Sequence, residues 1–415
     1  MAGEIKMGDR NTTKRFLTNI YGYTFFNSMM MLSPVYAIFM QANGMTDFDI
    51  SVLLMLWSGA VLVTQFPIAA CARKCGAKNI LFFGQILKAI AFLLWFVFPY
   101  YIGFAIGMIL WGMHGAIYNV VSEDVLYDEL RARTHNLTYE RVLGWRRNVA
   151  ALGTAFSAAG SLLLVYGYGL VTAVSIVALA ISMLFIMRMN LIQDYHGAQT
   201  DGSSQINAIK TAISTMRATP AIISMLILSV LVTNFSYLND YLSLIGVDIG
   251  LAPQYIGIVP FFILCCQMLG QTVAHKFTGV HPGFLYGAIV VAGALFGLFA
   301  WQYSLVGLLA LGAAYVICAI IKIITYARFQ NLTPSHSRME ILSFYSIADQ
   351  ATYMVVCLII GLGSLMGSWR YSIMIMAILL ASLGFWALVF LRRRYRRAQI
   401  MRDAPQITLR PSGQI

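Results

Sequence analysis

"PIAACARKCGAKNILFF", residues 67 to 83, places a short basic turn between two long apolar segments. Arg73 and Lys74 precede Gly76, Lys78 follows it, and the chain on either side is almost free of charge. Apolar segments joined by so short a turn are typical of a helical hairpin that crosses a membrane, and Lys and Arg concentrate in cytoplasmic turns. The stretch therefore predicts a cytoplasmic turn between two transmembrane helices.

Composition extends this prediction to the whole chain. Of the 415 residues, 59% are hydrophobic and only 11% are charged, and the mean hydropathy is +0.74, whereas a soluble protein carries about 25% charged residues. A transmembrane helix needs about 20 mostly apolar residues, and twelve segments meet this requirement. These segments are residues 16–41, 50–72, 80–99, 102–129, 141–166, 169–191, 219–246, 253–277, 284–302, 304–329, 340–366 and 371–391.

The basic residues are distributed unevenly over the links between these segments. Of 28 Lys and Arg residues, 23 fall in the two tails and in the links on one side, four lie inside the expected spans, and only Arg370 lies on the other side. The positive-inside rule then predicts a multi-pass protein of the cell inner (cytoplasmic) membrane with both termini in the cytoplasm. A basic girdle beside the membrane accounts for the net charge of +12 without nucleic-acid binding.

Sequence patterns for metal, nucleotide or covalent chemistry are missing. The six cysteines lie in or at the ends of apolar segments and lack the spacing of a disulfide framework or a zinc site. There is no GxxxxGK[ST] phosphate loop, so the sequence does not indicate ATP as the energy source. The first apolar segment is too long for a signal peptide and reads as an uncleaved span. We therefore expect no metal, no cofactor and no enzyme activity.

An internal repeat relates the two parts of the chain. "PIAACARKCG" (67–76) resembles "GQTVAHKFTG" (270–279), and "YDELRARTHNLTYER" (127–141) resembles "YARFQNLTPSHSR" (326–338), each pair being separated by roughly 200 residues. The pattern predicts an all-α polytopic membrane protein with twelve transmembrane helices in two pseudo-symmetric six-helix halves. The expected divisions are an N-terminal half at 1–191, a cytoplasmic linker at 192–218, a C-terminal half at 219–391 and a basic cytoplasmic tail at 392–415.

At these positions the chain resembles the major facilitator superfamily. The family signature between spans 2 and 3 is roughly G-x-L-x-D-R-x-G-R-R, and its counterparts here are Ala69, Lys74, Gly76 and Lys78. Arg73 stands at the acidic position of the signature, so the acidic part of the family's cytoplasmic gate is not carried over. The resemblance implies a secondary transporter whose two halves rock around a solute site near the middle of the membrane.

Two further stretches bear on this resemblance. "QNLTPSHSRMEILSFYSIADQ", residues 330 to 350, is similar to the family's turn into its eleventh helix. "GTAFSAAG", residues 153 to 160, has two glycines but lacks the proline of the Gly-Pro motif that many drug/proton antiporters carry in the fifth helix. The resemblance therefore extends to the fold, and less to drug antiport in particular.

Ionisable groups inside the expected spans are functional candidates because each costs several kcal/mol unless it is paired or hydrated. His114 lies near the middle of the fourth span, where it is either a proton carrier or a neutral ring with a hydrogen-bond partner. Lys88 lies at the depth of Glu123 and Asp124, so it is expected to pair with a carboxylate or to take part in coupling. Lys322 and Asp349 are the expected buried pair of the C-terminal half.

Two arginines near the start of the fifth span have two interpretations. Arg146 and Arg147 either snorkel to the cytoplasmic surface or pair with Asp124 or Asp128 as a gate. Together with the groups above, the buried-charge or gate candidates are Arg73, Lys88, Glu123, Asp128, Arg146, Arg147 and Lys322.

Polar stripes mark the first and seventh spans, which line the central cavity in the family that the chain resembles. Asp240 shares a helical face with Ser236 and Tyr237 in the seventh span. The proton-coupling candidates are His114, Asp124, Asp240 and Asp349. The substrate-cavity candidates are Asn19, Tyr23, Asn27, Trp111, Tyr118, Ser236, Tyr237 and Tyr353.

These features predict a secondary active transporter, expected to be monomeric, that moves a small organic solute together with protons. Export of an amphipathic compound is the first interpretation, because the spans are rich in aromatic residues and Met. Import of a nutrient, a peptide fragment or a siderophore-like solute is the alternative. A lipid flippase or a membrane-embedded enzyme is the alternative of another class.

Overall fold

The structure, a computed structural model, describes residues 2–132, 139–192, 220–277, 279–333 and 338–403. This part of the chain consists of helices joined by turns and contains no β-strand. Within these described ranges, eleven helical stretches are long and apolar enough to cross a membrane. They coincide with eleven of the expected spans, and the twelfth, residues 16–41, is divided between two helices. The all-α polytopic fold is therefore confirmed.

The N-terminal half contains six transmembrane segments. Its elements are α1 (Ala2–Ser28), α2 (Tyr36–Ala42), α3 (Asp47–Cys75), α4 (Ala77–Val97), α5 (Tyr101–Ala132), α6 (Tyr139–Ser157), the 3-10 helix η1 (Ala158–Tyr166) and α7 (Tyr168–Met187). The basic turn at residues 67–83 is tight: α3 ends at Cys75, α4 begins at Ala77, and Gly76 between them has a φ of 82°. Glycine adopts this left-handed conformation without strain.

The C-terminal half repeats the plan. Its elements are α9 (Pro220–Phe235), η2 (Asn239–Tyr241), α10 (Leu242–Asp248), η3 (Pro253–Tyr255), α11 (Ile258–Val273), η4 (Ala274–Phe277), α12 (Pro282–Gln302), α13 (Leu308–Leu332), α14 (Arg338–Ser364) and α15 (Trp369–Asp403). The expected linker at 192–218 lies, apart from its first residue, outside the described residues. α15 continues as one helix into the expected basic tail.

The first transmembrane segment of each half is broken, which corrects the prediction of continuous spans at 16–41 and 219–246. α1 ends at Ser28 and α2 begins at Tyr36, shortly after Pro34, which lacks a backbone N–H and disfavours helix in the residue before it. α9 ends at Phe235, and the chain continues through η2 into α10. No proline lies at this second break.

Side-chain hydroxyls satisfy a backbone N–H that each break releases. In the first break, Leu32 N donates to Ser175 Oγ at 2.9 Å. In the second, Leu238 N donates to Tyr315 Oη at 2.9 Å. Because a backbone N–H inside a membrane protein needs a partner, these hydroxyls stabilise the non-helical segments.

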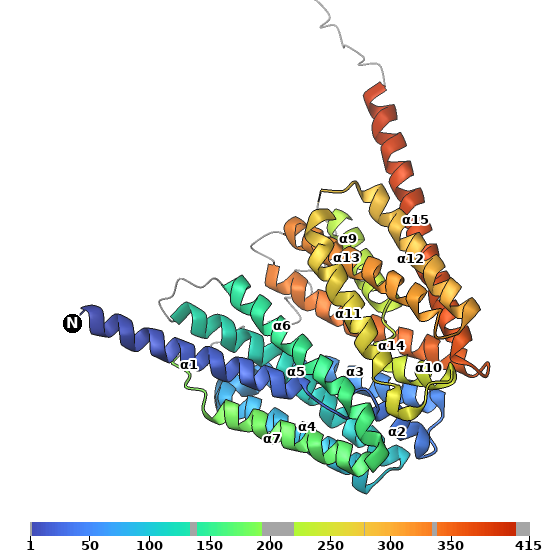
Figure 1. Cartoon of the computed structure of the whole chain (residues 1–415). Helices are drawn as coiled ribbons and strands as arrows, with labels where there is room; N and C mark the ends of the chain where they lie inside the picture. The colour runs from blue at the N-terminus through green and yellow to red at the C-terminus, as the bar shows by residue number, and fades with distance from the viewer. Residues whose placement is uncertain (1, 133–138, 193–219, 278, 334–337, 404–415) are drawn as a thin grey trace, which may run out of the picture.

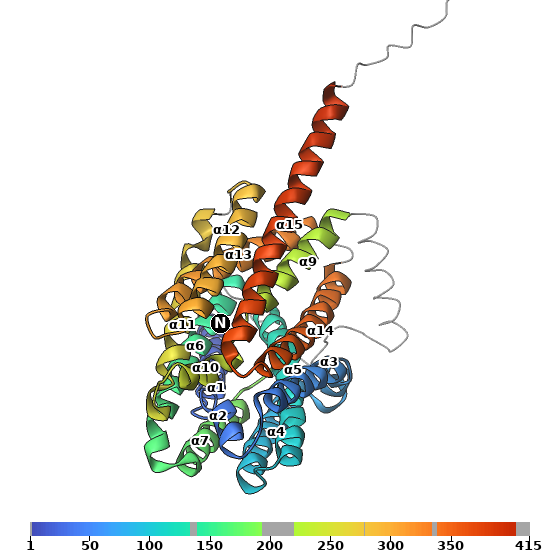
Figure 2. The ribbon, with the colours of Figure 1, turned by 90° about the vertical axis from the view of Figure 1, so that its right-hand side faces the viewer.

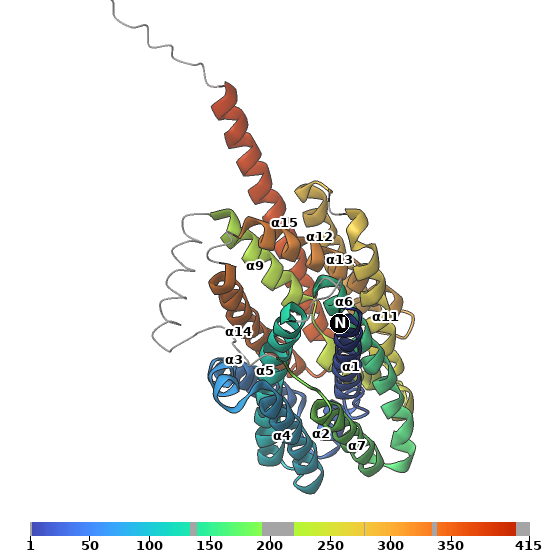
Figure 3. The same cartoon turned by 90° about the vertical axis from the view of Figure 1, so that its left-hand side faces the viewer.

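The two halves meet near the broken helices and diverge from there. In Figure 1, α1, α6 and α7 run from this meeting region toward the N-terminus, whereas α9, α12 and α15 run in another direction. Contacts between the halves join α3 to α14, α2 to α10, and η1 to η3. The side views in Figures 2 and 3 show α14 bordering α3.

A clamp of turns closes the C-terminal half near the meeting region. Tyr303, between α12 and α13, donates a 2.5 Å hydrogen bond to Asp248 at the end of α10, and Ser368 Oγ donates to the same carboxylate at 3.0 Å. Burial and the hydrogen bond to Asp248 raise the pKa of Tyr303 above its ordinary value. The phenol therefore remains protonated, and the bond persists, at and well above neutral pH.

Candidate functional site

Asp240 lies where the two broken helices meet. Its Oδ1 accepts a 3.0 Å hydrogen bond from Tyr36 Oη, and its Oδ2 accepts a 2.6 Å bond from Tyr353 Oη. Tyr36 is the first residue of α2, after the first break, and Asp240 follows the second break. We call Tyr36, Asp240 and Tyr353 the tyrosine–carboxylate cluster. Because Tyr36 belongs to the N-terminal half, this cluster connects the two halves.

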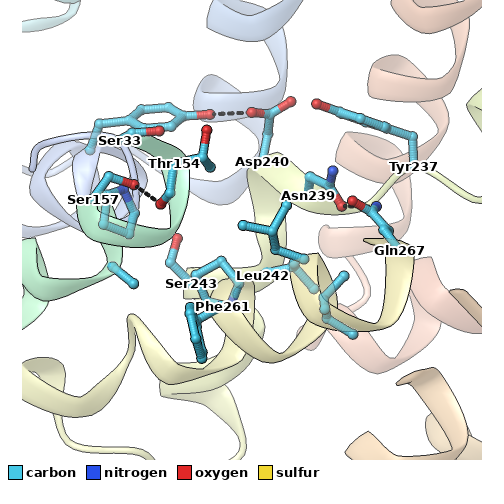
Figure 4. Close-up of a pocket in the computed structure, with 16 residues that line it drawn as sticks. Ser33, Thr154, Ser157, Tyr237, Asn239, Asp240, Leu242, Ser243, Phe261 and Gln267 are labelled. Atoms are coloured by element: carbon cyan, nitrogen blue, oxygen red, sulfur yellow. Dashed lines mark hydrogen bonds between the residues drawn. The ribbon is translucent and has the colours of Figure 1, made fainter. Parts of the chain in front are cut away.

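Two small cavities border this cluster. One, of about 180 Å³, is lined by residues of both halves, among them Ser33, Ser157, Asp240 and Gln267. Figure 4 shows this cavity, with Asp240 pointing toward the tyrosine of α2. A second cavity of about 170 Å³ contacts the other side of Asp240 and includes Trp57 of the N-terminal half. Asp240 is therefore only partly buried, with water-sized space on both sides.

A larger cavity of about 500 Å³ lies beyond Tyr237 and Asp240, and we call it the central cavity. Polar and aromatic side chains dominate its wall, which is formed by Arg147, Thr233, Ser236, Tyr237, Asn239, Gln267, Gln271, Tyr315, Cys318, Ala319, Lys322, Ile323, Tyr326, Tyr345 and Asp349. Arg147 comes from α6 of the N-terminal half, and the rest come from the C-terminal half. A volume of this size accommodates a small organic solute.

Lys322 and Asp349, the expected buried pair of the C-terminal half, share the wall of the central cavity. Within the described residues they do not form a direct ion pair. Asp349 Oδ1 accepts a 3.0 Å hydrogen bond from Asn234 Nδ2, while Lys322 is exposed to the cavity and interacts with Asp349 electrostatically. The two groups therefore face the cavity and are not joined in a direct ion pair, which differs from the predicted buried pair.

Lys88 has a different partner from the one predicted. Its Nζ donates to the backbone oxygen and to Oδ1 of Asn27, both at 3.0 Å, and the prediction of a carboxylate partner at Glu123 or Asp124 is wrong. The cause is the first helix break. α1 ends at Ser28, so the carbonyl of Asn27 has no partner in the next helical turn and carries the negative end of the helix dipole.

A buried polar cluster surrounds Lys88 inside the N-terminal half. Gln85 Nε2 donates to Asn27 Oδ1 at 3.1 Å and lies 3.2 Å from His114 Nε2, while Ser182 Oγ donates to Gln85 Oε1 at 3.0 Å. His114 and Asn27 are both buried, at 3% and 5% exposure. The structure therefore places Asn27 and His114 within one half, away from the wall of the central cavity.

Arg146 adopts neither of its two expected arrangements. It is buried, its Nη1 donates to the carbonyl of Ser122 at 3.0 Å, and its guanidinium lies 5.3 Å from the ring centroid of Tyr118. Tyr118 also contacts the rings of Tyr23 and His114. The snorkelling and carboxylate-pair interpretations are thus both wrong for Arg146, because a backbone carbonyl and an aromatic face stabilise its charge. Tyr23 and Tyr118 belong to this packed group.

The remaining predicted residues lie at several places. Asn19 Nδ2 donates to the carbonyl of Arg188, so Asn19 fixes the end of α7. Trp111 packs edge-on against Tyr36, with ring centroids 5.5 Å apart, and thereby supports the tyrosine–carboxylate cluster. Glu123, Asp124 and Asp128 are half-buried near the end of α5, and Arg73 is in the last turn of α3.

Sequence reasoning missed two buried side chains that make long-range hydrogen bonds. Tyr36 was not selected, although Pro34 two residues earlier signals a helix break. Glu129 was also missed: it is buried, and its Oε1 accepts a 2.7 Å hydrogen bond from the backbone N–H of Ile192. No spacing in the sequence marks Glu129, because its partner lies far along the chain.

The chain resembles known proteins both in its sequence family and in its fold. The family model described as Major Facilitator Superfamily matches residues 20–327. No curated protein sequence matches the chain. The fold is similar to that of a mutant form of the nucleoside transporter NupG, at a TM-score of 0.72 and 12% identity, over 90% of this chain and 99% of the other.

Two further solved structures show the same similarity. The POT family transporter PepTSo matches at a TM-score of 0.71 and 11% identity, over 94% of this chain and 99% of its own. A D-xylose-proton symporter matches at a TM-score of 0.67 and 12% identity, over 91% of this chain and 96% of its own. At such low identity the similarity shows a shared fold.

Proposed function

The chain belongs to the Major Facilitator Superfamily, and we propose that it transports a small organic solute across the cytoplasmic membrane in exchange or together with protons. The family and the fold indicate a transporter rather than an enzyme. The central cavity is the proposed solute site, and Asp240 is the proposed proton-coupling group. The similar protein whose name includes proton symport supports this type of coupling.

The observation that carries the proposal is the position of Asp240 between the two halves. Its carboxylate accepts hydrogen bonds from Tyr36 of one half and Tyr353 of the other. Within the described residues no ammonium or guanidinium group lies at ion-pair distance from it. A proton is therefore the partner best suited to neutralise this carboxylate, and the two cavities that border it have room for the water that would deliver one.

Protonation of Asp240 also acts on the contact between the halves. Hydrogen bonds to an ionised acceptor are about twice as strong as bonds between neutral groups. A proton on Asp240 therefore weakens the bond from Tyr36, which the halves must break to separate at this end. Proton binding and opening are coupled in this way, without any need for a second ion.

The positive-inside distribution gives this mechanism its direction in the membrane. With both termini in the cytoplasm, the contacts at Tyr36–Asp240, Ser51–Tyr241 and Ser161–Gly257 lie on the outer side and close it. The central cavity then belongs to an inward-facing state. Rocking of the halves around this cavity is the proposed transport step.

Export of an amphipathic organic compound remains our first proposal for the direction. Four tyrosines line the central cavity together with amides and three charged groups, a wall that suits a molecule with an aromatic body and polar ends. Import is the second proposal, favoured by the similarity to a proton symporter. Uptake into sealed vesicles of the two orientations, with solutes found by metabolite profiling of cells lacking the protein, distinguishes these directions.

The test of coupling is Asp240→Asn. The variant keeps a hydrogen-bonding side chain but cannot release a proton. We therefore expect it to lose accumulation of the solute against its concentration gradient, while solute exchange at equal pH on both sides persists. Asp248→Asn, eight residues further and outside the tyrosine–carboxylate cluster, is the matched control and should retain accumulation. If Asp240→Asn concentrates solute at the wild-type rate with unchanged pH dependence, Asp240 is not the coupling group.

A further inference from the structure

Two basic side chains from opposite halves face the central cavity. Arg147 of α6 and Lys322 of α13 both line it, and both are exposed to its interior. Within the described residues neither side chain donates a hydrogen bond, although Arg carries five N–H donors and Lys carries three. Their N–H groups therefore face the interior of the central cavity from both halves.

The wall offers these cations too little negative charge. Among the described side chains that line the central cavity, Asp349 is the one carboxylate, and one of its oxygens already accepts a hydrogen bond from Asn234. The formal charge of the wall is therefore positive. Since Coulomb interactions strengthen in the low-dielectric interior of a protein, such a wall attracts an anion and repels a cation.

We propose that the central cavity binds an organic anion, with its carboxylate or phosphate group held between Arg147 and Lys322. The tyrosines of the wall, among them Tyr315 and Tyr326, contact the apolar body of the solute. This inference rests on the proposed function, because it takes the central cavity as the solute site, and it names the chemical class of that solute.

The proposal also explains how the solute promotes closure. Arg147 and Lys322 belong to different halves, so rocking toward the occluded state brings two like charges together. An anionic group between them converts this repulsion into attraction from both sides. The loaded carrier therefore closes readily, while the empty carrier resists closure unless another anion is present.

The experiment measures binding to the purified full-length protein at neutral pH and fixed ionic strength. The probes share one skeleton: phenylacetate is an anion, phenylacetamide is neutral, and phenethylamine is a cation. Phenylacetate should raise the thermal unfolding temperature, and the other two should not. Phenyl phosphate, tested in parallel, distinguishes recognition of a phosphate from recognition of a carboxylate.

Charge-removing variants then locate the bound anion. Arg147→Gln and Lys322→Gln should each weaken phenylacetate binding by about ten- to a hundredfold, the usual effect of losing a hydrogen bond to a charged group. Arg147→Lys and Lys322→Arg retain the charge and should retain most of the affinity, which separates loss of binding from misfolding. Lys276→Gln, at an exposed position in η4, is the control and should bind as the wild type does.

The outcomes are decisive and independent of proton coupling. Equal stabilisation by the neutral or cationic probe, no shift with any anion, or unchanged phenylacetate binding in both Gln variants would overturn the proposal. Asp240→Asn should still bind phenylacetate. If it binds the anion and also transports with normal coupling, the proposed function of Asp240 fails while the anion site stands.

Discussion

At the scale of single residues, the tyrosine–carboxylate cluster makes one hydrogen bond that joins the halves and one that does not. Tyr36 reaches Asp240 from the N-terminal half, whereas Tyr353 and Asp240 both belong to the C-terminal half. The two bonds involve the same chemical groups but differ in what they hold together. This difference provides a matched pair of variants.

Tyr36→Phe should open the outer side, and Tyr353→Phe should not. The first change removes a bond between the halves, at a cost of about 1.5–3 kcal/mol for a bond to a charged group, but keeps the ring packed against Trp111. We expect faster labelling of a cysteine introduced at Ser33 by a membrane-impermeant maleimide added from outside. Equal labelling rates in the two Phe variants would contradict this role of Tyr36.

At this scale, the sequence predicted which side chains are candidates for the site better than it predicted the residues with which they form hydrogen bonds. Asp240 stood out because it follows Ser236 and Tyr237 at helical spacing in the sequence, although the break after Phe235 interrupts that helix. Tyr36 did not, since its partner lies in the other half and after a second break. Lys88 was correctly identified as buried, but its depth pointed to carboxylates, whereas the end of α1 provides a carbonyl oxygen of Asn27 instead.

At the scale of helices, two lysines bind the carbonyl ends of helices in different surroundings. Lys88 Nζ is buried and bonds to Asn27 near the end of α1. Lys78 Nζ donates at 2.7 Å to the carbonyl of Met187, the last residue of α7, at an exposed position. The interaction of a cation with a helix C-terminus is stronger where water does not screen it.

Lys88→Met should therefore destabilise the protein more than Lys78→Met. The first change leaves the buried backbone oxygen of Asn27 without its donor, while Oδ1 keeps the bond from Gln85. This loss costs about 1.5–3 kcal/mol, while the second change removes a surface contact worth less than about 1 kcal/mol. The measurement is thermal unfolding of each purified variant. Similar losses in the two variants would show that Lys88 does not stabilise the break in the first transmembrane segment.

The positions of the helices were predictable because the apolar segments are long and the links are polar. The breaks within the helices were only partly predictable. Pro34 gives a local signal for the first break. The second break contains no proline: it depends on Tyr315, which accepts a bond from the backbone of Leu238 across 77 positions of the chain. Such a tertiary interaction leaves no local pattern in the sequence.

At the scale of the whole molecule, the uneven distribution of basic residues predicts the orientation. A reporter fused after Ile415 and one inserted within residues 195–205 should both be cytoplasmic, whereas one inserted at 248–250 should be outside. Activity of paired reporters, one active only in the cytoplasm and one only outside, measures this. If Gly250 and Ile415 lie on the same side, the twelve-span topology is wrong. Charge and repeat patterns thus predict the two halves. They do not predict at which ends of the helices the two halves contact each other.

Close backbone contact between the halves provides the last prediction. Gly257 N donates to Ser161 Oγ at 3.0 Å, and a Cβ on Gly257 would lie 2.1 Å from the carbonyl oxygen of Ala158. Gly257→Ala must therefore push η1 away from the start of α11. Overpacking of this kind costs about 2 kcal/mol, which changes a two-state ratio roughly thirtyfold, and the cost falls only on the state in which the outer side is closed.

We expect Gly257→Ala to shift the carrier toward the outward-facing state, with the cytoplasmic ends of the halves closer together. Distances between spin labels at Gly144 and Lys276, one in each half, measure this shift in a background without exposed native cysteines. Gly287→Ala is the control, because a Cβ there meets no atom within 4 Å, and its distances should match the wild type. An unchanged distribution in Gly257→Ala would mean that the η1–α11 contact does not determine the closed state, and closure would then depend on the Tyr36–Asp240 bond and on the α3–α14 contact.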